Sequence, residues 1–145
     1  MTRVVTLSQP PEEVLRWLVL SDPRVARVLG MDFHAILSPG SPDLPFAVFS
    51  RQSVDRAGTL ASGPSRSSNV AVEVRVYAAA YEEAREIANA IRERIDCYTG
   101  EAYGLDIGGI HLTGESDDYV SLGGEQLATA YQVTLSFTVR WSEVA

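Results

Sequence analysis

The clearest pattern along the chain is a strict alternation of apolar and polar positions between residues 69 and 78. Successive side chains of a strand point to opposite faces, so a period of two predicts a strand with one buried side. The two sides would carry Val70, Val72, Val74 and Val76, and Ala71, Glu73, Arg75 and Tyr77. A longer alternation from Ala128 to Trp141 predicts a second strand, which we expect to lie centrally in an antiparallel sheet.

The hydrophobic period changes to 3.6 residues between Ala79 and Asp96, which predicts an amphipathic helix. Its apolar face would consist of Ala84, Ile87, Ala88, Ile91 and Ile95. Near the start of the chain, two prolines followed by two glutamates are typical of a first helical turn and predict a helix over about residues 10–20. A second, shorter helix is predicted between Asp22 and Gly30, so the chain would begin with a helical pair.

The remaining segments carry weaker signals. Residues 33–37 form a short apolar stretch, and residues 38–45 contain three prolines and a glycine, which are typical of a loop. Residues 44–53 and 107–114 are predicted strands, and residues 97–106 a turn. In chain order these elements predict an α+β fold. We expect an antiparallel sheet of four to five strands, with the long helix and the N-terminal helical pair packed on one face.

Two predicted loops, at about residues 54–69 and 115–127, are long. Each joins two predicted strands that a short turn could connect. Loops of more than about 12–15 residues are uncommon in compact domains and are usually functional or disordered. Either they are simple flexible insertions or they become ordered against a neighbouring subunit or partner. On the second interpretation the contact residues would be Asp55, Arg56 and Arg66 in the first loop and Glu115, Asp117, Asp118 and Tyr119 in the second.

Composition narrows the class of protein. A chain of 145 residues, 46% hydrophobic and 21% charged, is predicted to fold as one ordinary globular domain over residues 1–145. Its single cysteine, Cys97, cannot form an internal disulfide. No apolar run approaches the roughly 20 residues of a membrane span, and the first residues lack a signal-peptide pattern. We therefore expect synthesis in the cytoplasm and no membrane partner.

The net charge of −7 is concentrated in the last third of the chain. Residues 1–95 contain 11 acidic residues and 11 arginines, whereas residues 96–145 contain 8 acidic residues and only Arg140, so 1 − 8 = −7. An acidic surface repels a phosphate backbone, and a conventional nucleic-acid binder needs clustered positive charge. The charge pattern therefore argues against DNA as a held ligand.

The sequence offers little reaction chemistry. His34 and His111 lie on predicted strands without a nucleophile or paired metal ligand at a typical spacing, and we interpret them as structural. Cys97 follows Asp96 at a helix end, where negative charge disfavours the reactive thiolate, so we expect it to pack. The acids at 115, 117 and 118 could bind a hard cation with His111, but they lack an EF-hand spacing. We expect no catalytic residue, no cofactor and no bound metal.

The polar side of the strand at 69–78 is the other candidate site. Ala71, Glu73, Arg75 and Tyr77 would form a mixed surface together with Thr134, Thr138 and Arg140 if the two strands are neighbours. That surface is either solvated or an interface between subunits, where Arg and Tyr are enriched. Glu73 and Arg75 are therefore further candidate contact residues.

The order and spacing of several segments resemble the tail terminator or tail completion proteins of long-tailed, siphovirus-like phages and related tail-derived particles. The resemblance covers about residues 10–141. Its main part is the strand VAVEVRVYA at 70–78, followed at once by the helix YEEAREIANAIR at 81–92. Supporting segments are Asp22–Val25, Leu44–Phe49, Ile110–Leu112 with Asp117–Tyr119, and Phe137–Trp141.

The resemblance implies a structural virion protein with no enzymatic activity. Members of this family form a ring, usually a hexamer, on the head-proximal end of the tail tube, where the ring ends tube polymerisation and provides the docking surface for the neck or head. The implied partners are copies of this chain, the tail tube protein and a neck or head-completion protein. Assembly would take place in the host cytoplasm. DNA would pass through the lumen without specific binding, and the acidic last third would line the lumen or its rim.

Two alternatives stay open at this point. The protein could be another adaptor between head and tail, such as a head-completion protein. Less favoured is a small-molecule-binding or enzymatic α+β domain with a pocket around His111 and Asp117, the only candidate acid–base pair.

Overall fold

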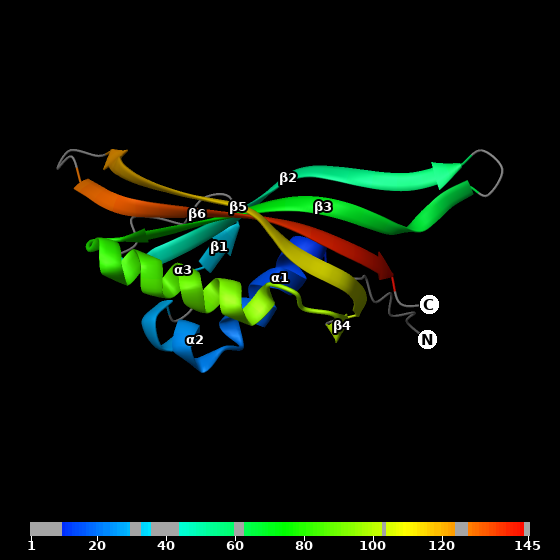
Figure 1. Ribbon diagram of the computed structural model, residues 1–145, viewed down its shortest axis with the longest axis horizontal. Coiled ribbons are helices and arrows are strands. Elements are labelled where there is room, and N and C mark those ends of the chain that lie inside the picture. The colour runs from blue at the N-terminus through cyan, green and yellow to red at the C-terminus, as the bar shows by residue number, and fades with distance from the viewer. Residues whose placement is uncertain are drawn as a thin grey trace, which may run out of the picture.

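The computed structural model describes residues 10–29, 33–35, 44–59, 63–102, 104–123 and 128–143 (Figure 1). Within these residues, three helices and six strands follow one another. They are α1 (Pro11–Leu20), α2 (Pro23–Leu29), β1 (Phe33–Ala35), β2 (Phe46–Thr59), β3 (Gly63–Ala78), α3 (Tyr81–Ile95), β4 (Gly100–Ala102), β5 (Leu105–Gly123) and β6 (Ala128–Glu143). The predicted loop at 38–45 falls largely outside the described residues.

All six strands belong to one sheet, in the order β1-β2-β3-β6-β5-β4. Strands β2 to β6 are paired antiparallel, and the three-residue β1 adds a parallel edge through Phe33 and Ala47. The predicted α+β class with its antiparallel sheet is confirmed, and β6 has the central position expected for it. Short β4 lies inside the segment predicted as a turn, where only three residues pair with β5.

The prediction of two long loops is wrong, because most of the residues in these segments form strands. Asp55 pairs with Asn69 and Arg56 with Ser68, so β2 and β3 continue as a hairpin as far as Thr59 and Gly63. In the same way β5 continues to Gly123, which pairs with Ala128 of β6. These extensions carry polar residues on both faces, and main-chain hydrogen bonds form a ladder whatever the side chains are. No period-two signal therefore marked them in the sequence.

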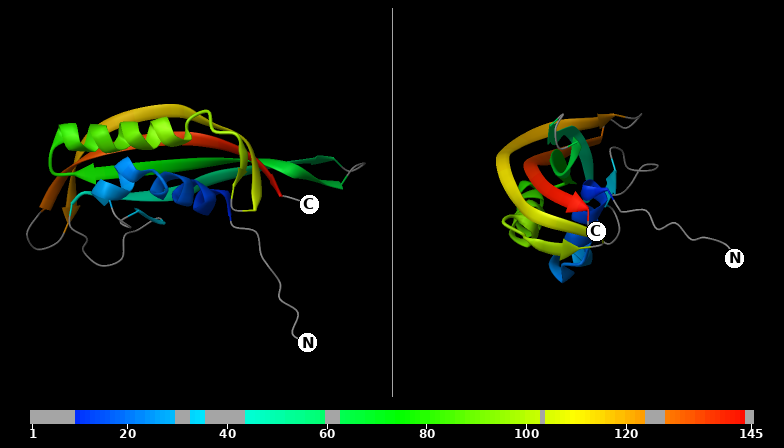
Figure 2. Two further views of the ribbon diagram at one scale, coloured as in Figure 1. Left: turned by 90° about the horizontal axis from the view of Figure 1, so that it is seen from below. Right: turned by 90° about the vertical axis from the view of Figure 1, so that its right-hand side faces the viewer.

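The core lies between one face of the sheet and the three helices (Figure 2). The even-numbered valines from 70 to 76 and the odd-numbered residues of β6 from 133 to 139 are all buried on this face. The apolar side of α3 packs onto them with Ala84, Ile87, Ala88, Ile91 and Ile95, the five residues predicted for it. The helical pair α1 and α2 packs on the same face, beside α3. The helices therefore leave the opposite face of the sheet uncovered.

Removal of a large side chain from this core tests the packing. Phe137 is 1% exposed, so Phe137→Ala leaves a cavity and should lower the free energy of unfolding by about 3–5 kcal/mol. Thr138→Ala, on the uncovered face of the same strand, should cost less than about 1 kcal/mol. Urea denaturation followed by circular dichroism measures both, and equal losses would contradict the assigned faces.

Candidate functional site

The polar face predicted from the sequence exists and spans β3 and β6. Arg75 lies opposite Thr134, and Ala71 opposite Thr138, so the two strands are the neighbours that this prediction required. Glu73 and Arg75 form an ion pair with each other across this face. Gln132 donates a hydrogen bond through Nε2 to the Tyr77 hydroxyl oxygen at 3.4 Å. The result is a half-buried surface of mixed charge that α1, α2 and α3 leave uncovered.

An aromatic pair borders the polar face on β2. Phe46 lies opposite Tyr77 in the sheet, and the two rings are stacked with their centroids 4.8 Å apart. Val48 lies opposite Arg75 on the same face. Both Phe46 and Val48 are buried, although they lie outside the helix-covered core cluster. Sequence reasoning missed them, but the run Phe46-Ala47-Val48-Phe49, apolar on both faces, was the signal that could have found them.

Two of the predicted acidic contact residues lie on the helix side of the sheet instead. Glu115 and Asp117 are opposite Leu135 and Val133, whose side chains face α3. Arg85 of α3 reaches both acids, with 3.1 Å from Nη2 to Glu115 Oε1 and 3.1 Å from Nη1 to Asp117 Oδ1. The Tyr81 hydroxyl donates to Asp117 Oδ2 at 3.0 Å. These contacts fasten the start of α3 to the β5–β6 hairpin.

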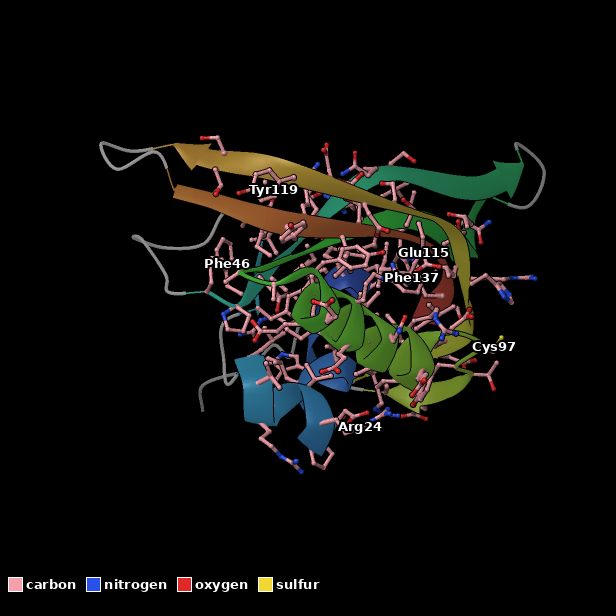
Figure 3. The ribbon with its side chains drawn as sticks, turned by 60° about the vertical axis from the view of Figure 1, so that its left-hand side comes forward. Arg24, Phe46, Cys97, Glu115, Tyr119 and Phe137 are labelled. Carbon is pink, nitrogen blue, oxygen red and sulfur yellow. The ribbon has the colours of Figure 1, made fainter. Side chains whose placement is uncertain are left out.

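The third of these acids, Asp118, and the neighbouring Tyr119 lie on opposite faces of the sheet. Asp118 is paired with Gln132 and so faces the uncovered side, where its carboxylate accepts the main-chain N–H of Tyr119 at 2.8 Å. Tyr119 is 58% exposed and lies on the β5–β6 hairpin (Figure 3). Its ring centroid lies 4.9 Å from that of Tyr131. Tyr131 also contacts Tyr81 edge to face, which continues the connection to α3.

These contacts shift the pKa values of Tyr81 and Arg85. The hydrogen bond to the Asp117 carboxylate raises the pKa of Tyr81, because the neutral phenol is the form that donates it. For Arg85, burial acts to lower the pKa, but the hydrogen bond to Glu115 and the charge of Asp117 outweigh it, and the net direction is upward. Arg85 is therefore a fixed positive charge between two carboxylates.

The first hairpin carries the other predicted contact residues. Asp55 and Arg56 lie on β2 and Arg66 on β3. The β2–β3 hairpin projects beyond the helices at one end of the molecule, and the paired ends of β5 and β6 near Gly123 and Ala128 lie at the opposite end (Figures 1 and 2). The candidate residues therefore lie at both ends of the molecule and on the uncovered face between them.

A groove of about 400 Å³ separates α2 from α3 and is the place where a small-molecule site could be sought. Arg24 lines it, but its guanidinium is already bound to Asp22 at 3.0 Å and Glu93 at 2.6 Å. His111 and Asp117, the pair considered for acid–base chemistry, are six residues apart on one strand, a span of about 20 Å. Arg24 and Glu93 in the groove are therefore already paired with each other, and His111 and Asp117 are too far apart to act on one small molecule.

The prediction that Cys97 packs in the interior is wrong, because Cys97 is exposed. It lies directly after α3, beside β5 and close to His111, which is exposed as well.

Comparison with known proteins gives the family. The model of the family "Tail completion protein gp17" matches residues 13–141, nearly the whole chain. The chain belongs to this family. No curated protein matches the sequence. A chain in a solved structure titled "Virion of native gene transfer agent (GTA) particle" has the same fold, with a TM-score of 0.62, 16% sequence identity, and coverage of 91% of this chain and 94% of that chain.

As a tail completion protein, the chain is a structural component of the virion tail. The resemblance noted in the sequence is thereby confirmed at the level of the family. No helix within the described ranges is long and apolar enough to cross a membrane.

The contact between α3 and the hairpin of this tail completion protein can be tested by titration. Asp117→Asn removes the carboxylate that accepts from the phenol, so the pKa of Tyr81 should fall toward its ordinary value. Asp118→Asn, whose side chain lies on the other face, should leave it unchanged. NMR titration with ring-labelled tyrosine resolves the six phenols, and an unmoved Tyr81 in Asp117→Asn would contradict the contact.

Proposed function

We propose that this tail completion protein forms a homo-oligomeric ring, a hexamer, at the head-proximal end of the tail tube. The ring ends tube polymerisation and offers the docking surface for the neck or head. The observation that carries the proposal is the uncovered polar face of the sheet, continuous with two hairpins at opposite ends of the molecule. Such a surface allows the protein to contact several neighbouring subunits at once, as a structural role in assembly requires.

The edges of the sheet support association between copies. Within the described residues, β2 beyond Phe49 pairs with β3 alone, and β5 from Thr113 to Gly123 pairs with β6 alone. Proteins rarely leave long strand edges open, because unpaired main-chain groups invite pairing with another chain. These two edges lie on opposite sides of the sheet. Contacts between two different edges are heterologous, and such contacts close into a ring when the rotation between copies allows it.

The contact residues in this proposal come from three places. The β2–β3 hairpin contributes Asp55, Arg56 and Arg66, the uncovered face contributes Glu73 and Arg75, and the β5–β6 hairpin contributes Asp118 and Tyr119. Glu115 and Asp117 act within the chain, because Arg85 already forms ion pairs with both. Their role is to hold the hairpin in position for contact with a neighbour.

The excess of acidic residues in the last third fits a ring through which DNA passes. Exposed carboxylates repel the phosphate backbone, so DNA would move through the lumen without adhering to it. The acids that are not engaged by Arg85, such as Asp106 and Asp118, are the candidates for this surface.

Tube capping is the decisive experiment. Purified tail tube protein is polymerised alone and with this protein, and tube lengths and ends are measured by electron microscopy. We expect shorter tubes with a ring on one end, and light scattering after size-exclusion chromatography measures the mass of any free ring. Tubes of unchanged length and bare ends would overturn the proposal, whereas binding to isolated heads in place of tubes would favour a head-completion role.

A charge reversal on the uncovered face locates the contact. Arg75→Glu places two like charges at 73 and 75, and we expect it to reduce capping at least about tenfold, as for a buried charged pair at an interface. Glu82→Arg, on the exposed side of α3, is the matched control and should cap normally. Both variants should keep the wild-type circular dichroism spectrum. Normal capping by Arg75→Glu would remove this face from the proposed interface.

A further inference from the structure

The segment that follows α3 is held against β5 by three hydrogen bonds. The main-chain N–H of Cys97 donates to Ile110 O at 2.7 Å, and that of Ile110 donates to Tyr98 O at 3.2 Å. The N–H of Leu112 donates to Asp96 Oδ1 at 3.0 Å. Residues 96–98 thus run beside residues 110–112, which brings the side chains of Asp96 and Cys97 next to His111.

These three side chains form a group with the ligand types of a metal site. Their candidate ligand atoms, a carboxylate oxygen, a sulfur and an imidazole nitrogen, all lie within 4.8 Å of one another. Cys97 Sγ is 3.9 Å from Asp96 Oδ1. In a tetrahedral zinc site with bonds of about 2.0–2.3 Å, neighbouring ligand atoms are about 3.3–3.8 Å apart. Rotations of exposed side chains are enough to close the difference.

The local structure prepares this arrangement. Cys97 has a positive φ of 65°, which turns the chain at the end of α3 so that its N–H meets Ile110. Gly109 leaves space for the imidazole, because a Cβ there would lie 3.1 Å from His111 Nε2. The Asp96 carboxylate is oriented by the Leu112 N–H, in the way that outer hydrogen bonds orient metal ligands. Figure 3 shows Cys97 at the surface beside β5, where an ion can enter from solvent.

We infer that Asp96, Cys97 and His111 bind a divalent transition-metal ion of the zinc type, with the fourth coordination position open to water. The mixed sulfur, nitrogen and oxygen donors favour zinc or cobalt over magnesium or calcium, which prefer oxygen alone. On binding, the thiol of Cys97 releases its proton to solvent and coordinates as the thiolate. The ion joins the end of α3 to β5. This site differs from the acids at 115, 117 and 118, and it is independent of the proposed ring.

Direct titration of the purified full-length protein tests the site. In isothermal titration with Zn²⁺ under reducing conditions, we expect one ion per chain. Cys97→Ser and His111→Ala should each weaken zinc binding by at least about tenfold. Removal of a residue that only hydrogen-bonds to a metal ligand already lowers metal affinity about 10–100-fold. Asp118→Asn, a distant exposed acid on the same strand, should bind as wild type. Equal affinity in wild type and Cys97→Ser, or no binding, would overturn the site.

Two further measurements keep the test independent of variant folding. Co²⁺ added to the wild-type protein should produce a thiolate-to-cobalt charge-transfer band, and its absence would overturn coordination by Cys97. Zn²⁺ should slow modification of Cys97 by a thiol reagent at least about fivefold, whereas Mg²⁺ should not, as its preference for oxygen predicts. Equal protection by the two ions would contradict a site built on the thiolate.

Discussion

The fold depends on the burial of one apolar row from each of two neighbouring strands beneath a single helix. The valines of β3 and the odd-numbered residues of β6 from 133 to 139 are almost fully buried, and the apolar side of α3 covers them. Each buried side chain of this size contributes about 1.5–3 kcal/mol relative to exposure. Because the opposite side chains of the same strands need no cover, the sheet presents a polar face as a direct result of this one-sided core.

Beyond that core, main-chain pairing carries the structure further. Register pairs continue along β2 and β3 to Gly63 and along β5 and β6 to Gly123, where side chains are mostly polar. Strands of this kind cannot rely on hydrophobic burial, so separate contacts must fasten them. Arg85 and Tyr81 of α3 do this for β5 by binding Glu115 and Asp117. The two hairpins give a small virion protein a reach that its core alone would not provide.

The end of α3 shows how the same packing brings polar side chains from distant segments together. Three hydrogen bonds bring residues 96–98 beside 110–112, and they place a carboxylate, a thiol and an imidazole together at the surface. The other end of α3 meets the acidic part of β5 through Arg85. The helix is thus connected to one strand at both ends, by ionic contacts near its start and by the segment that follows its last turn.

The sequence by itself determined the elements whose side chains alternate or recur at helical spacing. It predicted the strand at 69–78, the strand at 128–141, the helix covering 81–95 and the N-terminal helical pair, because each of these has an apolar side that must be buried. It also identified the polar face with Glu73 and Arg75. Only the tertiary structure decided the hairpins, the inward position of Glu115 and Asp117, and the meeting of Cys97 with His111. These depend on register between distant segments, and pairing through the main chain leaves no periodic mark on the side chains.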